Sequence, residues 1–294
     1  MSVRILHGIR EIAADYDGFL LDLWGVLHDG SQPFPEVLDA LRRLKAAGKT
    51  LVILSNAPRR ATMVAERLVE IGIPTNLYDA LHSSGEEAWL HLKNRDDPFF
   101  RALGRRCYFI GPQRDDPLLV GLEYQRVADV AQADFFLAVG PENWEGDLSA
   151  FTAVLDAGLA RKLPMVCANA DLVVDHQGRR SICAGAMAEY YEQRGGRVRW
   201  HGKPYRSVYD FCFARFAEHG VADRSRIVAF GDSFRTDIAG ASGAGIACVL
   251  TASGIHADEI GLTHAAPLDP RRIAALAATA GSAVPTAAMG EFRW

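Results

Sequence analysis

The sequence has no long hydrophobic run. Nowhere do ~18 apolar residues follow one another, which is the length that a membrane-spanning helix needs. In the stretch MSVRILHGIREIAADYDGF, charged residues interrupt every short apolar run, unlike the hydrophobic region of a secretory signal peptide. The sequence therefore predicts a cytoplasmic protein with no membrane partner.

A strong excess of one charge is also missing. Lysine and arginine together number 32 and aspartate and glutamate 36, which gives a net charge of -4, and these residues are scattered along the chain. This pattern excludes the basic surface that attracts nucleic acid or anionic membranes. We therefore expect a small molecule as the partner and no nucleic acid.

Paired cysteine motifs are missing as well. The five cysteines show neither a CxxC motif nor the Cys/His spacing of a metal site. Most of them lie in or beside apolar segments, where a buried thiol behaves as a small hydrophobic side chain. We expect these thiols to have a packing role rather than a redox or metal-binding role.

Short apolar runs alternate with helical patterns along the chain. Each run is bounded by turn-forming or charged residues, which is typical of buried strands. The expected strands are GFLLDLW, KTLVILSN, RCYFIG, ADFFLAVG, PMVCANAD, SRIVAFGD and GIACVLT. The expected helices span residues 36–47, 59–71, 148–159 and 207–218.

This alternation predicts a doubly wound α/β fold with a mostly parallel sheet. A chain of 294 residues, 49% of them hydrophobic, can bury two modest cores, so we expect two domains. Two charged stretches, KNRDDPFFRALGRR and EQRGGRVRWHGKP, are candidates for the points where the chain leaves one domain and returns to it. An inserted domain of roughly 100 residues between them has an ordinary size.

An aspartate ends the first buried strand. In FLLDLWGVLHDG the apolar run ends at Asp22, and Gly25 and Gly30 then turn the chain. The carboxyl end of a buried parallel strand is where open α/β sheets bind their ligands. A lone aspartate there could equally cap the following loop, so Asp22 by itself does not decide between catalysis and structure.

Three other strand ends or loops carry polar residues suited to phosphate. Ser55 and Asn56 end LVILSN, and hydroxyl and amide groups donate hydrogen bonds to phosphate oxygens. HGKP places Lys203 in a loop, where its ammonium can neutralise a phosphoryl group. Asp232 ends IVAFGD, and Asp237 follows at the start of a predicted helix.

Together these residues make up the set that phosphoryl transfer needs. The reaction requires a nucleophile in line, a divalent cation and donors for the equatorial oxygens, with little other covalent chemistry. Each short match is weak by itself, but the order of the matches and their position at strand ends are more specific. The residues therefore predict a phosphoryl-transfer site.

This pattern resembles the haloacid dehalogenase (HAD) superfamily, and specifically its class IIA branch of NagD-like phosphatases. DLWGVLHDG is similar to the family's first motif, LVILSNAPR to the second, GKP to the third and GDSFRTDIAGASGAG to the fourth. The resemblance implies a Rossmann-like catalytic core of residues 1–96 and 197–294, with an inserted α/β cap domain of residues 97–196 that selects the substrate. It is also compatible with a homodimer, since caps in this branch often carry the dimer contact.

The resemblance implies a role for each metal-site residue. Asp22 would attack phosphorus and form an aspartyl-phosphate intermediate, which splits one difficult displacement into two. Mg²⁺ would be held by the carboxylates of Asp22 and Asp232 and by the main-chain carbonyl of Trp24. Asp237 would orient this set of ligands.

The remaining residues would contact the phosphoryl group or the substrate. By the same resemblance, Lys203 would stabilise the charge of the transition state, and Ser55 and Asn56 would bind phosphoryl oxygens. Arg59, in SNAPR, is a further candidate for a substrate contact. An arginine in the first turn of a helix is about as often simply exposed, so its role stays open.

The sequence departs from the family at one position. In the phosphatases of this superfamily the first motif reads Asp-x-Asp, and its second aspartate protonates the leaving oxygen and then activates water; here that position is Trp24. A general acid/base typically contributes 10²- to 10⁴-fold, or roughly 3 to 5 kcal/mol of barrier lowering. Three interpretations remain: His28 or Asp29 takes over, the leaving group needs no proton, or the chain binds a phosphorylated ligand with little turnover.

We predict a HAD-type phosphoric monoester hydrolase, dependent on Mg²⁺, that acts on a small phosphorylated metabolite. The enzymatic alternative is a phosphonatase-like or phosphomutase-like reaction, and the non-enzymatic alternative is a metabolite-binding protein. Asp22, Lys203, Asp232 and Asp237 favour an enzyme, whereas Trp24 favours the alternatives. The substrate is not predicted, because the cap loops that choose it carry no readable signature.

Overall fold

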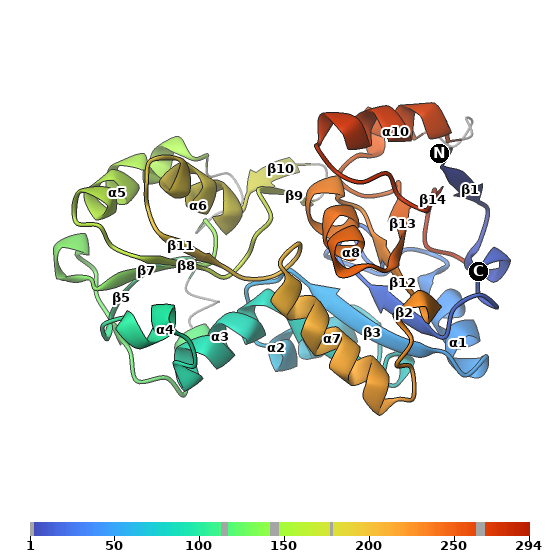
Figure 1. Ribbon diagram of the computed structural model, residues 1–294, viewed down its shortest axis with the longest axis horizontal. Coiled ribbons are helices and arrows are strands. Elements are labelled where there is room, and N and C mark those ends of the chain that lie inside the picture. Colours follow the sequence, from blue (N-terminus) through green and yellow to red (C-terminus); the bar gives the residue numbers. More distant parts are fainter. Residues whose placement is uncertain (1–2, 113–116, 142–146, 177–178, 263–267) are drawn as a thin grey trace. The chain divides into compact units, whose positions relative to one another are not determined.

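The chain forms two compact units, which the computed structural model describes over residues 3–112, 117–141, 147–176, 179–262 and 268–294 (Figure 1). The first unit consists of Met1–Ser55, Ala65–His82 and Lys203–Trp294. The second consists of Asn56–Val64 and Ser83–Gly202. Each unit is built around its own sheet.

The first unit contains a seven-stranded sheet with the order β1-β14-β13-β12-β2-β3-β4. The pairings from β1 through to β3 are all parallel. In sheet order the strands span Arg4–Leu6, Ala287–Met289, Ala247–Thr251, Ile227–Gly231, Gly18–Leu21, Thr50–Ser55 and Ala80–Ser83. The order reverses direction around β2, as in doubly wound folds, so the predicted Rossmann-like core is confirmed.

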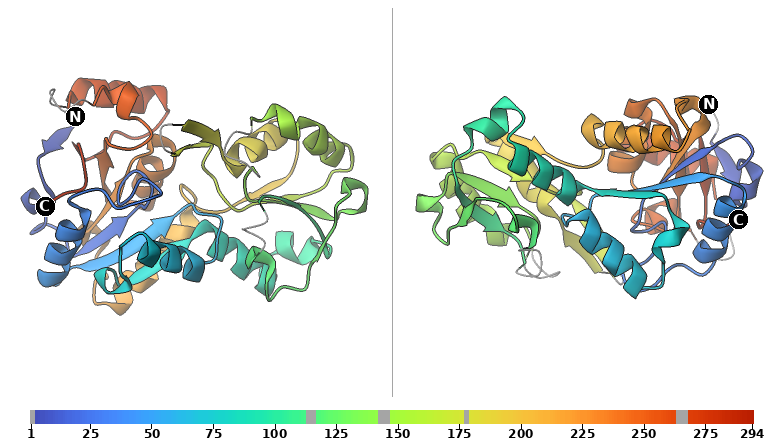
Figure 2. Two further views of the ribbon diagram at one scale, coloured as in Figure 1. Left: turned by 180° about the vertical axis from the view of Figure 1, so that it is seen from behind. Right: turned by 90° about the horizontal axis from the view of Figure 1, so that it is seen from below.

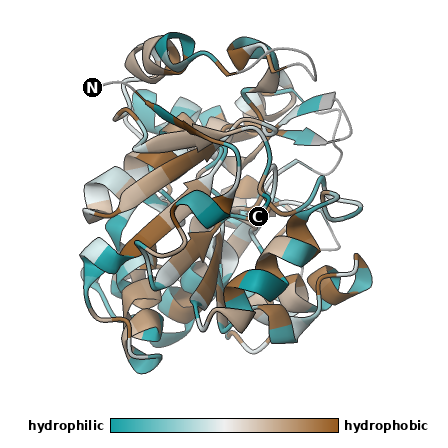
Figure 3. Ribbon diagram, turned by 90° about the vertical axis from the view of Figure 1, so that its right-hand side faces the viewer, coloured by the Kyte–Doolittle hydropathy of each residue, from teal (hydrophilic) through white to brown (hydrophobic). Residues whose placement is uncertain are grey.

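The central strands β2, β3 and β12 are buried along their whole length. A parallel sheet is covered by helices on both faces, which is why these strands read as continuous apolar runs in the sequence. Figure 3 shows the same contrast, with brown apolar strands inside and mixed teal and brown helices around them. Because both faces of the central strands are buried, the sequence predicted these strands well.

Helices cover both faces of the first sheet. They are α1 (Val37–Ala46), α7 (Arg206–Glu218), α8 (Ala239–Ala244), α9 (Ala257–Ile260) and α10 (Pro270–Thr279). The view from below in Figure 2 shows α7 and α1 on opposite sides of the sheet. Short 3₁₀ turns span Ile9–Glu11, Thr75–Leu77 and Arg224–Arg226, and a π-helix, η6, spans Phe234–Ile238. The helix α2 (Ala61–Glu70) divides between the two units.

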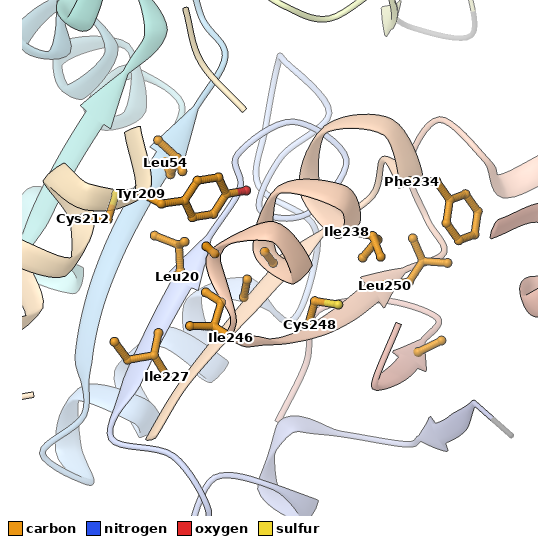
Figure 4. Packing of buried hydrophobic residues seen from close by; sticks show 14 of the residues in the cluster. Leu20, Leu54, Tyr209, Cys212, Ile227, Phe234, Ile238, Ile246, Cys248 and Leu250 are labelled. Carbon is orange, nitrogen blue, oxygen red and sulfur yellow. The ribbon is translucent and has the colours of Figure 1, made fainter. Parts of the chain in front are cut away.

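One hydrophobic core lies between the sheet face that α7 covers and the helices α7, α8 and α10. Alternate side chains of a strand point to opposite faces, and accordingly Val52 and Leu54 of β3 both enter this core. Tyr209 and Cys212 of α7 meet them there (Figure 4). The packing fixes the sheet whose strand ends carry the predicted site.

The second unit contains a five-stranded parallel sheet, β11-β8-β7-β5-β6, and an antiparallel hairpin. The sheet strands span Val198–Trp200, Met165–Cys167, Phe135–Ala138, Arg106–Ile110 and Gln125–Arg126. The hairpin pairs β9 (Val173–His176) with β10 (Arg179–Ile182). The helices are α3 (Ser84–Asn94), α4 (Pro98–Ala102), α5 (Ser149–Ala160) and α6 (Ala184–Gln193), with a 3₁₀ turn at Val130–Gln132.

The helices of the second unit cover its sheet on both faces. Leu137 and Val166 point toward α3 and α4, and the neighbouring Phe136 and Met165 point toward α5 and α6. Figure 1 shows α3 and α4 on one side of the strands and α5 and α6 on the other. The second unit is therefore an α/β layer structure with its own core.

The border between the units differs from the expected residues 96 and 196. The chain returns to the first unit after Gly202, within the predicted stretch EQRGGRVRWHGKP, but the second unit already includes Ser83. The reason is that α3 packs Ala88, Trp89 and Leu92 into the core of the second unit. The apolar pattern of a helix shows that it is amphipathic without showing which sheet it covers.

The structure contains each of the seven expected strands and each of the four expected helices, the latter as α1, α2, α5 and α7. It adds β1, β4, β6, β11 and β14, which are short, and β9 and β10, which form a hairpin. All five cysteines are buried, and none of them forms a disulfide bond in the described part of the chain. Among the described residues no helix is both long enough and apolar enough to span a membrane.

Candidate active site

The predicted site residues lie at the carboxyl ends of neighbouring strands in the first unit. Asp22 follows β2 directly, and its main-chain nitrogen donates to Phe230 of β12 at 3.0 Å, so it continues the pairing of these strands. Asp232 follows β12 directly. Because parallel strands end at the same edge of a sheet, the pairing of β2 with β12 places both carboxylates together.

Four predicted residues meet in one buried cluster. Lys203 Nζ lies 2.5 Å from Asp22 Oδ1 and 2.7 Å from Asp237 Oδ1, and donates a hydrogen bond to each. One carboxylate oxygen from each of Asp22, Asp232 and Asp237 lies within 4.8 Å of the others. All four side chains are almost fully buried. The structure therefore brings together the predicted nucleophile, the predicted cation and the two other predicted carboxylates.

Asp237 is held by a local turn. The π-helix η6 begins after Ser233, whose main-chain nitrogen donates to Asp237 Oδ2 at 3.1 Å. With Oδ1 bound by Lys203 and Oδ2 bound by this main-chain nitrogen, both carboxylate oxygens have a donor. Single π-helical turns are rare and occur frequently at functional sites.

Burial and neighbouring charges both act on the Asp232 carboxyl. Burial raises the pKa of Asp232 well above its usual range, and the neighbouring negative charges of Asp22 and Asp237 raise it further. A hydrogen bond from the main-chain nitrogen of Ile255 to Asp232 Oδ2, at 2.9 Å, acts in the opposite direction. A bound cation beside Asp232 would relieve the same repulsion.

Glycines leave the space that these carboxylates occupy. A Cβ on Gly254 would lie 2.0 Å from Asp232 Oδ2, and a Cβ on Gly25 would lie 2.2 Å from the same atom. A Cβ on Gly231 would lie 2.1 Å from the carboxylate carbon of Asp237. Any larger residue at these positions would push the carboxylates out of place. Gly254 lies outside the four motifs, so no sequence signal marked it as part of the site.

The cluster fits a small divalent cation. It offers carboxylate oxygens, the ligands that Mg²⁺ prefers, and one ammonium balances only one of the three carboxylates. The main chain at Gly25 and Gly254 lies close to the Asp232 carboxylate and limits its position. The role of the Trp24 carbonyl as a further ligand stays a prediction.

The predicted phosphate-binding residues do not all belong to the first unit. Ser55 is the last residue of β3, which pairs with β2, so it lies at the same sheet edge as Asp22 and is buried. Asn56 and Arg59 belong to the second unit, where the Asn56 amide donates to Asp171 Oδ1 at 2.9 Å. Their contacts with a phosphoryl group stay predictions.

Trp24 packs against its own loop. Its ring meets the ring of His28 edge to face, with centroids 5.5 Å apart, and a Cβ on Gly30 would lie 2.4 Å from the indole. Gly30 has a φ of +95°, which a residue with a side chain rarely adopts. The glycine predicted as a turn residue therefore also makes room for the Trp24 indole.

The side chains of His28 and Asp29 both accept hydrogen bonds within their own loop. These are the two residues predicted as possible substitutes for the general acid. Burial lowers the pKa of His28 to about 4, and its Nδ1 accepts a hydrogen bond from Gly30 at 2.9 Å. His28 is therefore neutral near pH 7 and holds no imidazolium proton to give. Asp29 Oδ1 accepts hydrogen bonds from the main-chain nitrogens of Ser31 and Gln32, each at 2.8 Å, so it stabilises its own turn.

Comparisons with known proteins agree with this geometry. A family model described as haloacid dehalogenase-like hydrolase matches residues 19–125, and a second HAD-hydrolase-like model matches residues 200–276. A crystal structure of a haloacid dehalogenase-like hydrolase from Brucella suis is 28% identical, with a TM-score of 0.81, and the match covers 97% of this chain and 98% of that one.

Two further comparisons concern proteins described as phosphatases. A glycerol-3-phosphate phosphatase from Homo sapiens is 28% identical over 274 residues, covering 84% of this chain and 82% of that protein. A glycerol phosphate phosphatase from Mycobacterium tuberculosis, solved in complex with magnesium, shares the fold with a TM-score of 0.61 at 22% identity, covering 89% of this chain and 77% of that one.

The two family matches include all four motifs and every residue of the buried cluster. The chain belongs to the haloacid dehalogenase-like hydrolases, a superfamily of enzymes.

Proposed function

We propose that the chain is a magnesium-dependent phosphatase that hydrolyses the phosphate ester of a small metabolite through an aspartyl phosphate on Asp22. The observation that carries the proposal is the buried contact of Asp22 with Lys203, in a cluster with Asp232 and Asp237. The human relative described as a glycerol-3-phosphate phosphatase supports the reaction class. We further propose that the second unit is the cap that selects the substrate.

The first displacement uses Asp22 and Lys203. A carboxylate oxygen of Asp22 attacks phosphorus, the bond from phosphorus to the ester oxygen breaks, and an acyl phosphate forms. Lys203, bound to both Asp22 and Asp237, keeps its ammonium at the attacking carboxylate and offsets the charge on the phosphoryl oxygens. Mg²⁺, when bound by the carboxylate cluster, supplies further positive charge for the phosphoryl oxygens.

The second displacement restores Asp22. Water attacks the phosphorus of the acyl phosphate, and the bond from phosphorus to the Asp22 oxygen breaks. Ester and water have then become alcohol and inorganic phosphate, and the proton lost by water balances the one that the alkoxide gains. Asp237, with both oxygens hydrogen-bonded, keeps Lys203 aligned through both steps.

The fate of the leaving group separates the two candidate reactions. An alkoxide needs a proton as it leaves, and Trp24 has only an indole N–H, which is no acid near neutral pH. His28 and Asp29 are engaged as described above. This observation favours, as a second candidate, a phosphonatase-like reaction or another substrate whose leaving group is stable without a proton.

A phosphate-release assay tests the proposal. Sugar phosphates, nucleotides, pyridoxal phosphate and phosphonates are compared in the presence of Mg²⁺ and in the presence of a chelator. We expect release from at least one ester with Mg²⁺ and none with the chelator. Release from phosphonates alone would select the second candidate.

The matched variant is Asp22→Asn, which is nearly isosteric but a poor nucleophile and a weaker metal ligand. We expect it to be folded by thermal melting and to lack turnover. Retained turnover in this variant would remove Asp22 from the mechanism, whichever substrate is used.

A further inference from the structure

A second cluster of potential metal ligands lies within the second unit, outside the motifs. Glu87 and His91 sit four residues apart on α3, so they share one face of that helix. His201 follows β11, and its main-chain nitrogen donates to Cys167 of β8 at 3.0 Å. One ligand atom from each of the three side chains lies within 4.8 Å of the others. The residue types are two imidazoles and one carboxylate.

His201 has buried nitrogen atoms without hydrogen bonds. The residue is 2% exposed, and among the described residues neither ring nitrogen has a hydrogen-bond partner. Leaving a buried polar atom unsatisfied costs about 1 to 3 kcal/mol, so such atoms call for an explanation. His201 Nδ1 faces Glu87 Oε2 at 3.1 Å, which is an ion-pair distance, but the arrangement lacks the angles of a hydrogen bond.

A separation of 3.1 Å is also what two ligands of one metal ion show. Two ligands at about 2.1 Å from a tetrahedral metal ion lie about 3.4 Å apart, and ligands at a right angle lie about 3.0 Å apart. The Glu87 Oε2 to His201 Nδ1 distance falls between these values. The pair is therefore spaced to share a cation.

His91 has the second contact typical of a metal-binding histidine. Its Nδ1 lies 2.7 Å from Asp96 Oδ1, which leaves Nε2 as the nitrogen available to a metal ion. Metal-ligating histidines usually donate their other ring N–H to a carboxylate, which fixes the tautomer and orients the ring. Phe100 stacks on the His91 ring, with centroids 5.1 Å apart, and holds it further.

Glu87 is also positioned from outside the cluster. The main-chain nitrogen of Gly202 donates to Glu87 Oε2 at 3.0 Å. The helix that carries Glu87 begins with a side-chain cap, in which Ser83 accepts a hydrogen bond from the main-chain nitrogen of Glu86. The side chains of Glu87 and His91 and the main chain of His201 are thus each held by a neighbour before any ligand binds.

We propose that Glu87, His91 and His201 form a binding site for a divalent transition metal ion such as Zn²⁺, distinct from the carboxylate cluster of the first unit. Imidazole nitrogen suits Zn²⁺, Co²⁺ and Ni²⁺, whereas Mg²⁺ prefers oxygen alone. Three protein ligands leave one position of a tetrahedral ion for water. The ion ties α3 to the segment that follows β11, two residues before Lys203.

Binding of Co²⁺ by the purified full-length chain tests this site. The protein is first stripped with a chelator and then kept in excess Mg²⁺, which occupies the carboxylate cluster. We expect one equivalent of Co²⁺ to bind and to give the visible absorption of a four-coordinate ion with nitrogen ligands. We also expect Zn²⁺ to displace it and to raise the melting temperature. Absence of a Co²⁺ spectrum and of any effect of Zn²⁺ on melting would overturn the proposal.

Three variants assign the site to these residues. His201→Gln and His91→Gln should each lower the affinity for Co²⁺ by more than about 100-fold, and Asp96→Asn, which loses only the orienting contact, by about 10- to 100-fold. His219→Gln, directly after α7 in the first unit and outside the cluster, is the control and should bind as the wild type does. Because His201 is buried, its replacement can prevent folding, so circular dichroism of the metal-free variants is measured first. If His201→Gln does not fold, the test relies on His91→Gln, since His91 is partly exposed. Unchanged Co²⁺ affinity in folded His91→Gln would also overturn the proposal.

Discussion

The two clusters of ligand atoms in this chain contrast in chemistry and in how they are built. The first consists of Asp22 and Asp232, which follow strands, and of Asp237 in the π-helix η6, and it offers only oxygen. The second combines Glu87 and His91 of α3 with His201 after β11 and offers nitrogen as well. Oxygen ligands favour Mg²⁺ and imidazoles favour transition metals, so the two sites should not compete for one ion.

The contrast also lies in the charge that surrounds each set. Lys203 contacts two carboxylates of the first cluster, so this cluster is organised to receive a phosphoryl group as well as a cation. The second cluster is contacted instead by the Asp96 carboxylate, the main-chain nitrogen of Gly202 and the apolar ring of Phe100. The first arrangement suits phosphoryl transfer, and the second suits a transition metal ion with one position left for water.

The largest effect that separates the clusters is expected from Lys203→Met. The change removes the only cation hydrogen-bonded to both Asp22 and Asp237 within the described chain, and loss of one such electrostatic contact costs about 10²- to 10³-fold in turnover. Steady-state kinetics of phosphate release measure it. Lys45→Met, which breaks an ion pair with Asp79 elsewhere in the first unit, is the control and should retain turnover. If both variants turned over substrate at the same rate, Lys203 would have a structural role and no role in the reaction.

The next effect concerns magnesium binding alone. In Gly254→Ala the new Cβ would lie 2.0 Å from Asp232 Oδ2, so the carboxylate must move, and we expect the affinity for Mg²⁺ to fall about 10-fold or more. Titration of activity with Mg²⁺ measures this, and Co²⁺ binding at the second cluster should not change. Gly243→Ala, whose Cβ meets nothing within 4 Å, is the control. An unchanged Mg²⁺ requirement in Gly254→Ala would place the cation away from Asp232.

A smaller, opposite effect is expected from Trp24→Asp. The new carboxyl restores the family's general acid, so turnover of alkyl phosphates should rise, by about 10-fold or more, while an activated aryl phosphate gains less because its leaving group needs little proton assistance. Loss of the packing against Gly30 and His28 can destabilise the loop, so melting is measured beside the kinetics. A folded variant with no gain on any alkyl phosphate would favour the phosphonate-type reaction.

The smallest effect is on stability at acid pH. Burial lowers the pKa of His28 from 6.5 to about 4, so below pH 6.5 the unfolded chain takes up a proton that the folded chain excludes, and stability falls as the pH falls toward 4. His28→Asn keeps an acceptor for Gly30 and does not titrate. At pH 5.5 the wild type should lose about 1 kcal/mol relative to this variant, compared with pH 8, by denaturant unfolding. Parallel pH profiles would mean that folding does not lower the pKa of His28.

The sequence predicted Asp22 and Asp232 of the first cluster because each follows a buried apolar strand. A buried parallel strand is recognisable as an apolar run, and its last residue or the next one lies at the sheet edge, as Ser55, Asp22 and Asp232 do. The second cluster has no such signal. Glu87 and His91 share a helix face, but their third partner lies more than a hundred positions later, and only the packing of α3 onto the second sheet brings His201 close.

The same reason explains the border between the units and the short strands. Whether α3 covers the first or the second sheet depends on the tertiary contacts of Trp89 and Leu92, which a single sequence does not contain. Strands of three residues such as β1 and β14 have too few residues for a periodic pattern. The role of Gly30 in making room for Trp24 likewise depends on the loop's own three-dimensional course.

Trapping of the covalent intermediate tests whether Asp22 is the nucleophile that forms the aspartyl phosphate. The enzyme is mixed with its substrate and Mg²⁺, quenched with borohydride, digested and examined by peptide mass spectrometry, since borohydride reduces an acyl phosphate of aspartate to homoserine. The proposed mechanism predicts homoserine at position 22. Its formation should depend on both substrate and Mg²⁺, and it should be absent from Asp22→Asn. Full turnover under the same conditions with Asp22 unmodified, or with the modification at another carboxylate, would contradict it.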